Sequence, residues 1–250
     1  MNQLFTRATL ILLALAQIPL LVLLGFLLVP GSPLAGHLVR GYILEHPELL
    51  PEAIDKLRAG DAAKAEQAER DAQKAVPAQL AALRKPYGSA WAGNPNGDVT
   101  VVAFMDYACG YCRASLPAIE ELIAKDPNVR IVYREYPVLG PGSVVAARWA
   151  LAAAEQGKYL AFHNALYAEG PPNAESIGDA TAKAGLDKAL AEKAADSKAV
   201  KDEIDGNHAL GQKLAMTGTP AWVIGEKLYL TGALDYDGLA EAVAEARKAK

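Results

Sequence analysis

The chain has 250 residues, 52% of them hydrophobic by a broad count, which is enough for one medium domain with appendages. Its net charge of −4 argues against a nucleic-acid partner, because such a partner usually requires a basic face. The two cysteines lie three positions apart, which excludes a framework of structural disulfides spread along the chain.

The first predicted element is an apolar segment without charge, from residue 8 to residue 29. About 20 apolar residues span a bilayer as a helix, whereas the apolar part of a cleaved secretory signal is usually shorter. Residues 1–36 are therefore interpreted as a membrane anchor or a signal segment with a short loop, and the anchor is favoured. Either interpretation places the rest of the chain on the other side of the membrane from the cytoplasm, where a disulfide can persist.

Residues 37–85 are predicted to form a helical extension. Its apolar residues near helical spacing are Leu38, Tyr42, Leu49, Ile54 and Leu57. The alanine-rich, charged stretch 62–75 is either a solvated connector or a stalk that spaces or oligomerises catalytic domains. Because this apolar set is too large to leave in water, residues 37–75 are expected either to mediate self-association or to pack back onto their own catalytic domain.

The turn-rich segment 85–98 is interpreted as the boundary of a domain at 86–250. A buried strand is predicted at residues 99–105, a helix from residue 109 to about residue 125, and a second strand at residues 129–136. This order makes a βαβ unit with the cysteine pair at its turn.

No strand is predicted between residues 143 and 216, where helical patterns recur. This stretch is interpreted as a helical insertion. Two short strands follow, at residues 221–225 and 227–230, and a last helix is predicted at residues 236–248. The fold class is therefore α/β.

The motif Cys109-Gly110-Tyr111-Cys112 carries the chemistry. Thiol–disulfide exchange needs a sulfur that attacks as a thiolate and a second sulfur close enough to resolve the mixed disulfide. Cys109, at the start of a helix, faces unpaired N–H groups and the positive end of the helix dipole, which stabilise a thiolate. We expect Cys109 to be the nucleophile and Cys112 the resolving thiol, with no cofactor other than their redox-active disulfide.

A metal site is not expected. A structural zinc site needs four ligands, and the four histidines lie far from the cysteine pair in sequence and show no ligand spacing.

The second part of the candidate site is Thr219-Pro220, just before the strand at residues 221–225. This proline could be an ordinary turn residue. In a redox fold, a cis bond here would bring the Thr219 backbone beside the cysteines, where it could pair with an extended substrate, although cis bonds are a minority of X-Pro bonds.

These residues together resemble the DsbA-like family of bacterial periplasmic thiol–disulfide oxidoreductases, and its ScsC-like members in particular. The most specific stretches are FMDYACGYC and GTPAWVIG, and GYILEHPELL matches the N-terminal extension that relatives use for oligomerisation. The resemblance implies a thioredoxin-like fold with a helical insertion, a nucleophilic Cys109, a resolving Cys112 and a cis Pro220 preceded by Thr219. It also assigns Gly110 and Tyr111 to substrate binding and active-site support.

The chain departs from the commonest family pattern at Ala103, where a glutamate often stands, so any role of that acid is missing. Glu135 lies in the stretch YREYP. It could be a partly buried acid that tunes proton transfer, but a solvated strand residue is favoured.

The leading hypothesis is an enzyme, a thiol–disulfide oxidoreductase or protein disulfide isomerase. Its expected partners are unfolded or misoxidised exported proteins and a membrane redox recycling protein. A homo-oligomer would favour isomerisation, and a monomer would favour oxidation. The alternative is a periplasmic metal-handling or chaperone-like protein whose thiols capture copper or clients, since soft thiolates suit Cu(I).

Overall fold

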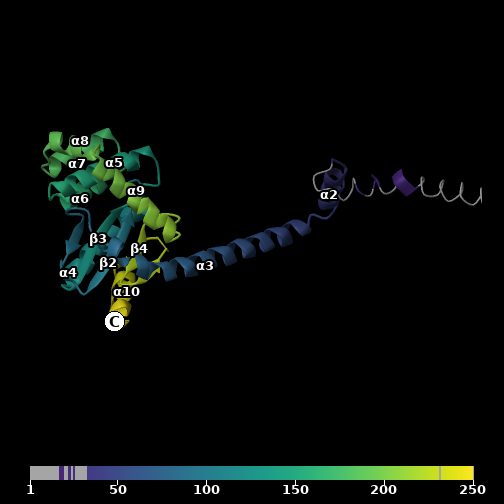
Figure 1. The fold of residues 1–250 in the computed structure, drawn as a ribbon, viewed down its shortest axis with the longest axis horizontal. Coiled ribbons are helices and arrows are strands. Elements are labelled where there is room, and N and C mark those ends of the chain that lie inside the picture. The colour runs from purple at the N-terminus through teal and green to yellow at the C-terminus, as the bar shows by residue number, and fades with distance from the viewer. Residues whose placement is uncertain (1–16, 20–21, 24, 26–32, 231, 250) are drawn as a thin grey trace, which may run out of the picture. The chain divides into compact units, whose positions relative to one another are not determined.

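The computed structural model describes residues 17–19, 22–23, 25, 33–230 and 232–249 (Figure 1). The chain divides into two compact units, Met1–Ala65 and Glu66–Lys250.

The first unit contains helix α2, Pro33–Glu45, and the beginning of helix α3, Leu49–Leu83. The helical extension is thus present, and the stretch 62–75 continues the same helix. Several large apolar side chains of this unit are exposed, among them Leu38, Tyr42, Leu44, Ile54 and Leu57.

The predicted membrane segment at residues 8–29 lies for the most part outside the described residues. Within the ranges that the structure describes, no helix is both long and apolar enough to cross a membrane.

The second unit is built on a five-stranded mixed sheet in the order β1-β3-β2-β4-β5. Its strands are β1 Trp91–Gly93, β2 Val99–Met105, β3 Val129–Glu135, β4 Ala221–Ile224 and β5 Lys227–Tyr229. β2 and β3 are parallel, and the other pairs are antiparallel. The predicted βαβ unit is therefore confirmed, because helix α4, Gly110–Lys125, connects β2 to β3. Strand β1 was not predicted, since its three residues lie in the turn-rich boundary.

Five helices separate β3 from β4 and form the helical insertion. They are α5 Pro141–Glu155, α6 Tyr159–Glu169, α7 Ala174–Lys183, α8 Lys188–Ala195 and α9 Lys198–Lys213. Helix α10, Tyr236–Lys248, follows the sheet. In Figure 1 the insertion gathers beyond one end of the sheet, while α10 lies near the C-terminus beside the strands.

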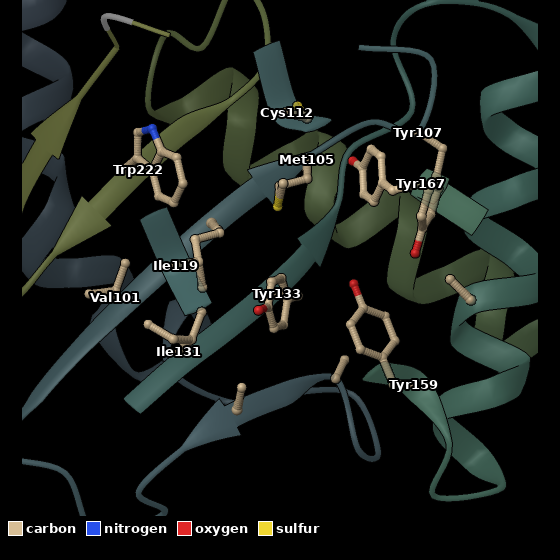
Figure 2. Packing of buried hydrophobic residues seen from close by; sticks show 14 of the residues in the cluster. Val101, Met105, Tyr107, Cys112, Ile119, Ile131, Tyr133, Tyr159, Tyr167 and Trp222 are labelled. Carbon is tan, nitrogen blue, oxygen red and sulfur yellow. The ribbon is translucent and has the colours of Figure 1, made fainter. Parts of the chain in front are cut away.

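The core has two sides because successive side chains of a strand point to opposite faces. Val101 and Met105 of β2 pack with residues of α4, α6 and α10, including Ile119 and Tyr159, as Figure 2 shows in part. Phe104, on the other face of β2, packs with residues from the end of α3 and from α9. The cysteine pair belongs to the first cluster.

The last part of α3 belongs to the second unit. Val76 and Leu83 are fully buried against the sheet. The side-chain amide of Gln73 donates to the carbonyl of Glu226 at 2.8 Å and accepts from the N–H of Leu228 at 2.8 Å. The second unit therefore begins before the boundary predicted at residue 86, because the charged surface of this helix hides a short apolar stripe.

Candidate active site

The redox motif begins where β2 ends. Cys109 is the N-cap of α4, with extended backbone angles (φ −82°, ψ 116°), and its N–H donates to the carbonyl of Asp106 at 3.0 Å. Its sulfur accepts a hydrogen bond from the N–H of Cys112 at 3.4 Å. The sulfur thus occupies the place that a capping oxygen usually takes, where helix N–H groups and the dipole favour negative charge.

The two cysteines are free thiols in different surroundings. Cys109 retains 6% exposure, whereas Cys112 is fully buried. Burial raises the pKa of the Cys112 thiol well above its ordinary value, and the nearby backbone of Asp106 only partly offsets this effect. Only Cys109 is therefore positioned to react first.

The Thr219–Pro220 segment lies against this motif. The peptide bond between the two residues is cis, as the resemblance implied. The sulfur of Cys109 donates to the carbonyl oxygen of Thr219 at 3.2 Å. The antiparallel pairing of β4 with β2 brings this segment to the same end of the sheet as Cys109.

Asp106 organises the loops around Cys109, a role that the sequence analysis missed. Its buried carboxylate accepts hydrogen bonds from the N–H groups of Ala108, Val138 and Leu139, at 2.8 to 2.9 Å. The loop after β3 is thereby fixed beside the loop that precedes Cys109. An aspartate between a buried strand and a cysteine motif was a signal for such a role.

Exposed apolar residues lie within the cysteine motif and in the loop that Asp106 fixes beside it. Tyr111, between the two cysteines, is 70% exposed, and Val138 and Leu139 are 42% and 54% exposed. Gly110 is also exposed. This surface can contact apolar side chains of an unfolded polypeptide.

The expectation that Glu135 is a solvated strand residue is wrong. Glu135 is 2% exposed, because the side chains of the α6 insertion cover the end of β3. Its Oε1 accepts hydrogen bonds from the hydroxyls of Tyr159 at 2.7 Å and Tyr107 at 3.2 Å. Burial raises the pKa of Glu135 to about 8, although both tyrosine hydrogen bonds act in the opposite direction.

The described part of the chain contains no cluster of side chains suited to bind a metal ion. Nowhere in it do three or more histidine, cysteine or acidic side chains come together in a way that could hold one. Among those residues, the dithiol of Cys109 and Cys112 offers the only paired sulfur ligands.

Two family models match the chain. The DSBA-like thioredoxin domain matches residues 100–244, and the N-terminal domain of the copper resistance protein ScsC matches residues 36–64. The first match covers the cysteine motif, the helical insertion and the Thr219–Pro220 segment. The second covers most of α2 and the beginning of α3.

Solved structures agree with the fold. A thioredoxin-like oxidoreductase from Silicibacter pomeroyi is 45% identical, with 64% of this chain and 92% of that chain covered and a TM-score of 0.62. The catalytic domain of Proteus mirabilis ScsC is 28% identical, with 70% and 97% covered and a TM-score of 0.63. A periplasmic thioredoxin-like protein from Salmonella enterica is 31% identical, with 67% and 94% covered and a TM-score of 0.61.

The chain covers less than half of the length of the curated proteins described next. It is 30% identical over 138 residues to a probable thiol:disulfide interchange protein DsbC from Bordetella avium, which covers 55% of this chain and 39% of that protein. It is also 40% identical over 78 residues to an Na(+)/H(+) antiporter NhaA 3 from Salinispora tropica, which covers 30% of this chain and 12% of the antiporter.

Proposed function

The chain belongs to the family of DSBA-like thioredoxin domains, and we propose that it exchanges disulfides with exported proteins through Cys109 and Cys112. The observation that carries this proposal is the contrast between the two thiols at the start of α4. Cys109 caps the helix and faces Thr219, whereas Cys112 is fully buried one turn further along.

The oxidising reaction starts from the Cys109–Cys112 disulfide. A client thiolate attacks the sulfur of Cys109, the bond between the two enzyme sulfurs breaks, and Cys112 leaves as a thiolate that takes up a proton. A second client thiolate then attacks the client sulfur of the mixed disulfide, and Cys109 leaves. Two electrons pass from the client to the enzyme, and a membrane redox protein would accept them in turn.

Isomerisation starts from the dithiol. The Cys109 thiolate attacks a client disulfide, and another client thiol displaces Cys109 from the mixed disulfide, so that no net electrons are transferred. An oligomer that holds several sites around one client would favour this reaction. The match of residues 36–64 to the ScsC N-terminal domain and the exposed apolar residues of α2 and α3 support such an assembly.

Client binding would use the backbone of Thr219 and the apolar surface formed by Tyr111, Val138 and Leu139. The Thr219 carbonyl already accepts a hydrogen bond from Cys109, so a client strand laid beside it would have its own sulfur near Cys109. We place this site on the periplasmic side of the inner membrane. The periplasmic relative from Salmonella enterica and the apolar segment at residues 8–29 support this location.

The test combines activity with trapping. Wild-type protein should reduce insulin with dithiothreitol as the electron source, and an assay of scrambled ribonuclease reactivation would distinguish isomerase from oxidase work. Cys112→Ser should accumulate mixed disulfides between Cys109 and client proteins, whereas Cys109→Ser should accumulate none. Absence of insulin reduction and of trapped clients would contradict the proposal. Stoichiometric Cu(I) binding by that inactive protein would instead favour the copper-handling alternative.

A further inference from the structure

Glu135 belongs to a buried cluster of ionisable groups that the exchange reaction described above does not use. The cluster joins the end of β3 to the loop before Cys109 and to α6. Its members around Glu135 are Asp106, Tyr107, Tyr133, Tyr159, His163 and Tyr167. In Figure 2 the hydroxyl ends of Tyr107 and Tyr159 are directed toward each other, and Glu135 accepts hydrogen bonds from both.

The cluster lies next to the cysteine pair. Glu135 pairs in register with Met105, the last residue of β2, and Tyr107 follows two positions later in the chain. The ring of Tyr107 lies 4.7 Å from the ring of Tyr167, centre to centre. The Tyr167 hydroxyl donates to the carbonyl of Asp106 at 3.0 Å, and the same carbonyl accepts the N–H of Cys109 at 3.0 Å, so two tyrosines connect Glu135 to the residue that carries the reactive sulfur. Ala103 lies on the same face of the sheet, at the position where a glutamate often stands in the family.

Among the described residues, Glu135 has hydrogen bonds from two tyrosines but no ion pair with a basic side chain. His163 contacts the Tyr107 hydroxyl through Nδ1 at 2.9 Å, and its Nε2 has no hydrogen-bond partner among the described residues. Burial lowers the pKa of His163 to about 3, so the imidazole is neutral near pH 7. A carboxylate at Glu135 is therefore buried without an ion pair, and a second negative charge nearby is costly there.

We propose that Glu135 is a positioning residue for the redox reaction, a buried acid that takes up a proton when the Cys109–Cys112 disulfide is reduced to a thiolate and a thiol. This inference rests on the proposed function. Reduction adds the negative charge of the Cys109 thiolate to a region that already holds the Glu135 carboxylate. The repulsion between the two charges is relieved when the carboxylate becomes a neutral acid.

The proton and electron balance closes with a client dithiol as reductant. The client loses two electrons and two protons and becomes a disulfide. The enzyme disulfide gains both electrons. Near and above pH 8, where Glu135 of the oxidised protein is ionised, one proton goes to Cys112, the other goes to Glu135, and Cys109 carries the negative charge that Glu135 carried before. At lower pH Glu135 already holds a proton, and the second proton goes to solvent.

The experiment is the equilibrium of the full-length protein with glutathione between pH 6 and pH 9, for wild type and for Glu135→Gln. The glutamine mimics the protonated acid, so the two proteins should have the same equilibrium constant near pH 6. Above pH 8 the wild-type carboxylate disfavours the thiolate form, and the variant should become the stronger oxidant by roughly three- to tenfold. A tenfold difference corresponds to about 30 mV for a two-electron couple. The pH dependence of glutathione itself cancels in the ratio of the two constants.

Two further variants make the test specific. Glu121→Gln removes an acid of α4 whose side chain is 45% exposed and pairs with Lys125. The ratio of its equilibrium constant to that of the wild type should stay near one from pH 6 to pH 9. Tyr159→Phe removes a hydrogen bond that favours the carboxylate, so the pH above which its oxidising strength falls should be higher than in the wild type. Because this comparison needs only the wild type, it also tests the inference if Glu135→Gln does not fold.

The inference would be overturned if the ratio of the equilibrium constants of Glu135→Gln and wild type were the same at pH 6 and pH 9. It would also be overturned if the pH profile of the Tyr159→Phe equilibrium constant matched that of the wild type. Failure of the proposed function would look different, because the wild-type protein would then not equilibrate with glutathione at all.

Discussion

The carbonyl oxygen of Thr219 lies 3.2 Å from the sulfur of Cys109, although 110 positions separate the two residues in the chain. The neighbouring strands β2 and β4 bring the two residues to the same end of the sheet. The sulfur therefore has backbone groups on two sides, the N–H of Cys112 and the carbonyl of Thr219. These two contacts fix the position of the Cys109 sulfur, while Cys112 stays fully buried.

The first prediction concerns the reactivity of the two thiols. In the reduced protein at pH 6 to 7, iodoacetamide should alkylate Cys109 at least about tenfold faster than Cys112. The thiolate is the nucleophile, and Cys109 has both residual exposure and the helix N-terminus, whereas Cys112 is fully buried with a raised pKa. Peptide mass spectrometry of samples quenched over time measures both rates. Each single Cys→Ser variant provides the control rate, and equal rates or a faster Cys112 would reverse the assignment of roles.

Much of this site could be predicted from the sequence because its signals are local. Cys109 and Cys112 follow a β-branched strand and begin an amphipathic helix, and Thr219 and Pro220 precede a strand. The βαβ unit follows from the same patterns. The cysteine motif and the βαβ unit depend on residues within a few positions of one another. The contact between Thr219 and Cys109 joins distant segments, and only the resemblance to the DsbA-like family implied it.

Glu135 could not be placed in the same way. Glu135 lies on the same face of β3 as Ile131 and Tyr133, but an acid at the end of a strand is usually solvated. The long insertion covers this end of the strand with Tyr159 and other residues of α6. The burial of Val76 and Leu83 was missed for a similar reason, since the polar surface of α3 conceals the few residues that face the sheet. In both cases contacts distant in sequence decide the burial.

The second prediction concerns the pH dependence of stability. The pKa of Glu135 is raised to about 8 in the folded protein, whereas an exposed glutamate in the unfolded chain has about 4.3. The folded state therefore binds more protons between these values, so the free energy of unfolding falls as the pH rises from about 4 to 8. Each unit of pKa difference contributes about 1.4 kcal/mol, and several kcal/mol are lost by pH 8.

Glu135→Gln should lack this dependence. Urea unfolding at pH 5, 6.5 and 8 should show the variant gaining stability relative to wild type as the pH rises. Glu121→Gln, at an exposed position, should follow the wild type. Parallel pH profiles for wild type and Glu135→Gln would mean that Glu135 is already ionised in the folded protein near pH 5.

The third prediction concerns Arg134, which lies on β3 and is 5% exposed. Its guanidinium donates to the carbonyls of Ala82, Leu83 and Lys85 at the end of α3, and it pairs with Glu203 of α9 at 2.6 Å. Arg134→Met should lower the free energy of unfolding by about 3 to 5 kcal/mol, because it leaves buried carbonyls and a carboxylate without their partner. Chemical denaturation measures this difference.

Arg70→Met is the matched control for Arg134. Arg70 lies on α3 with 57% of its side chain exposed, and its partners among the described residues, Glu66 and Gln67, belong to the same helix. Exposed pairs of this kind contribute little, so the change should stay within about 0.5 kcal/mol. An Arg134→Met protein as stable as this control would show that water can replace Arg134 as the hydrogen-bond donor to the carbonyls at the end of α3.

The last prediction concerns self-association through α2 and the beginning of α3. Leu44 is 69% exposed and Leu57 is 63% exposed, and burying a leucine side chain contributes about 1.5 to 3 kcal/mol. We expect the full chain to be an oligomer by light scattering and a Leu44→Lys, Leu57→Lys double variant to be a monomer. Insulin reduction should survive in the variant, since the cysteine pair lies in the other unit, whereas reactivation of scrambled ribonuclease should be lost.

The control for this variant places two lysines at exposed alanines of the same unit, Ala62→Lys and Ala65→Lys. These changes add the same charge without removing apolar surface, so the control protein should keep the wild-type mass and both activities. A wild-type monomer, or a double leucine variant with unchanged mass, would refute association through these helices. Isomerase activity would then lose its structural argument, because a single site cannot surround a client, and oxidation would be the better assignment.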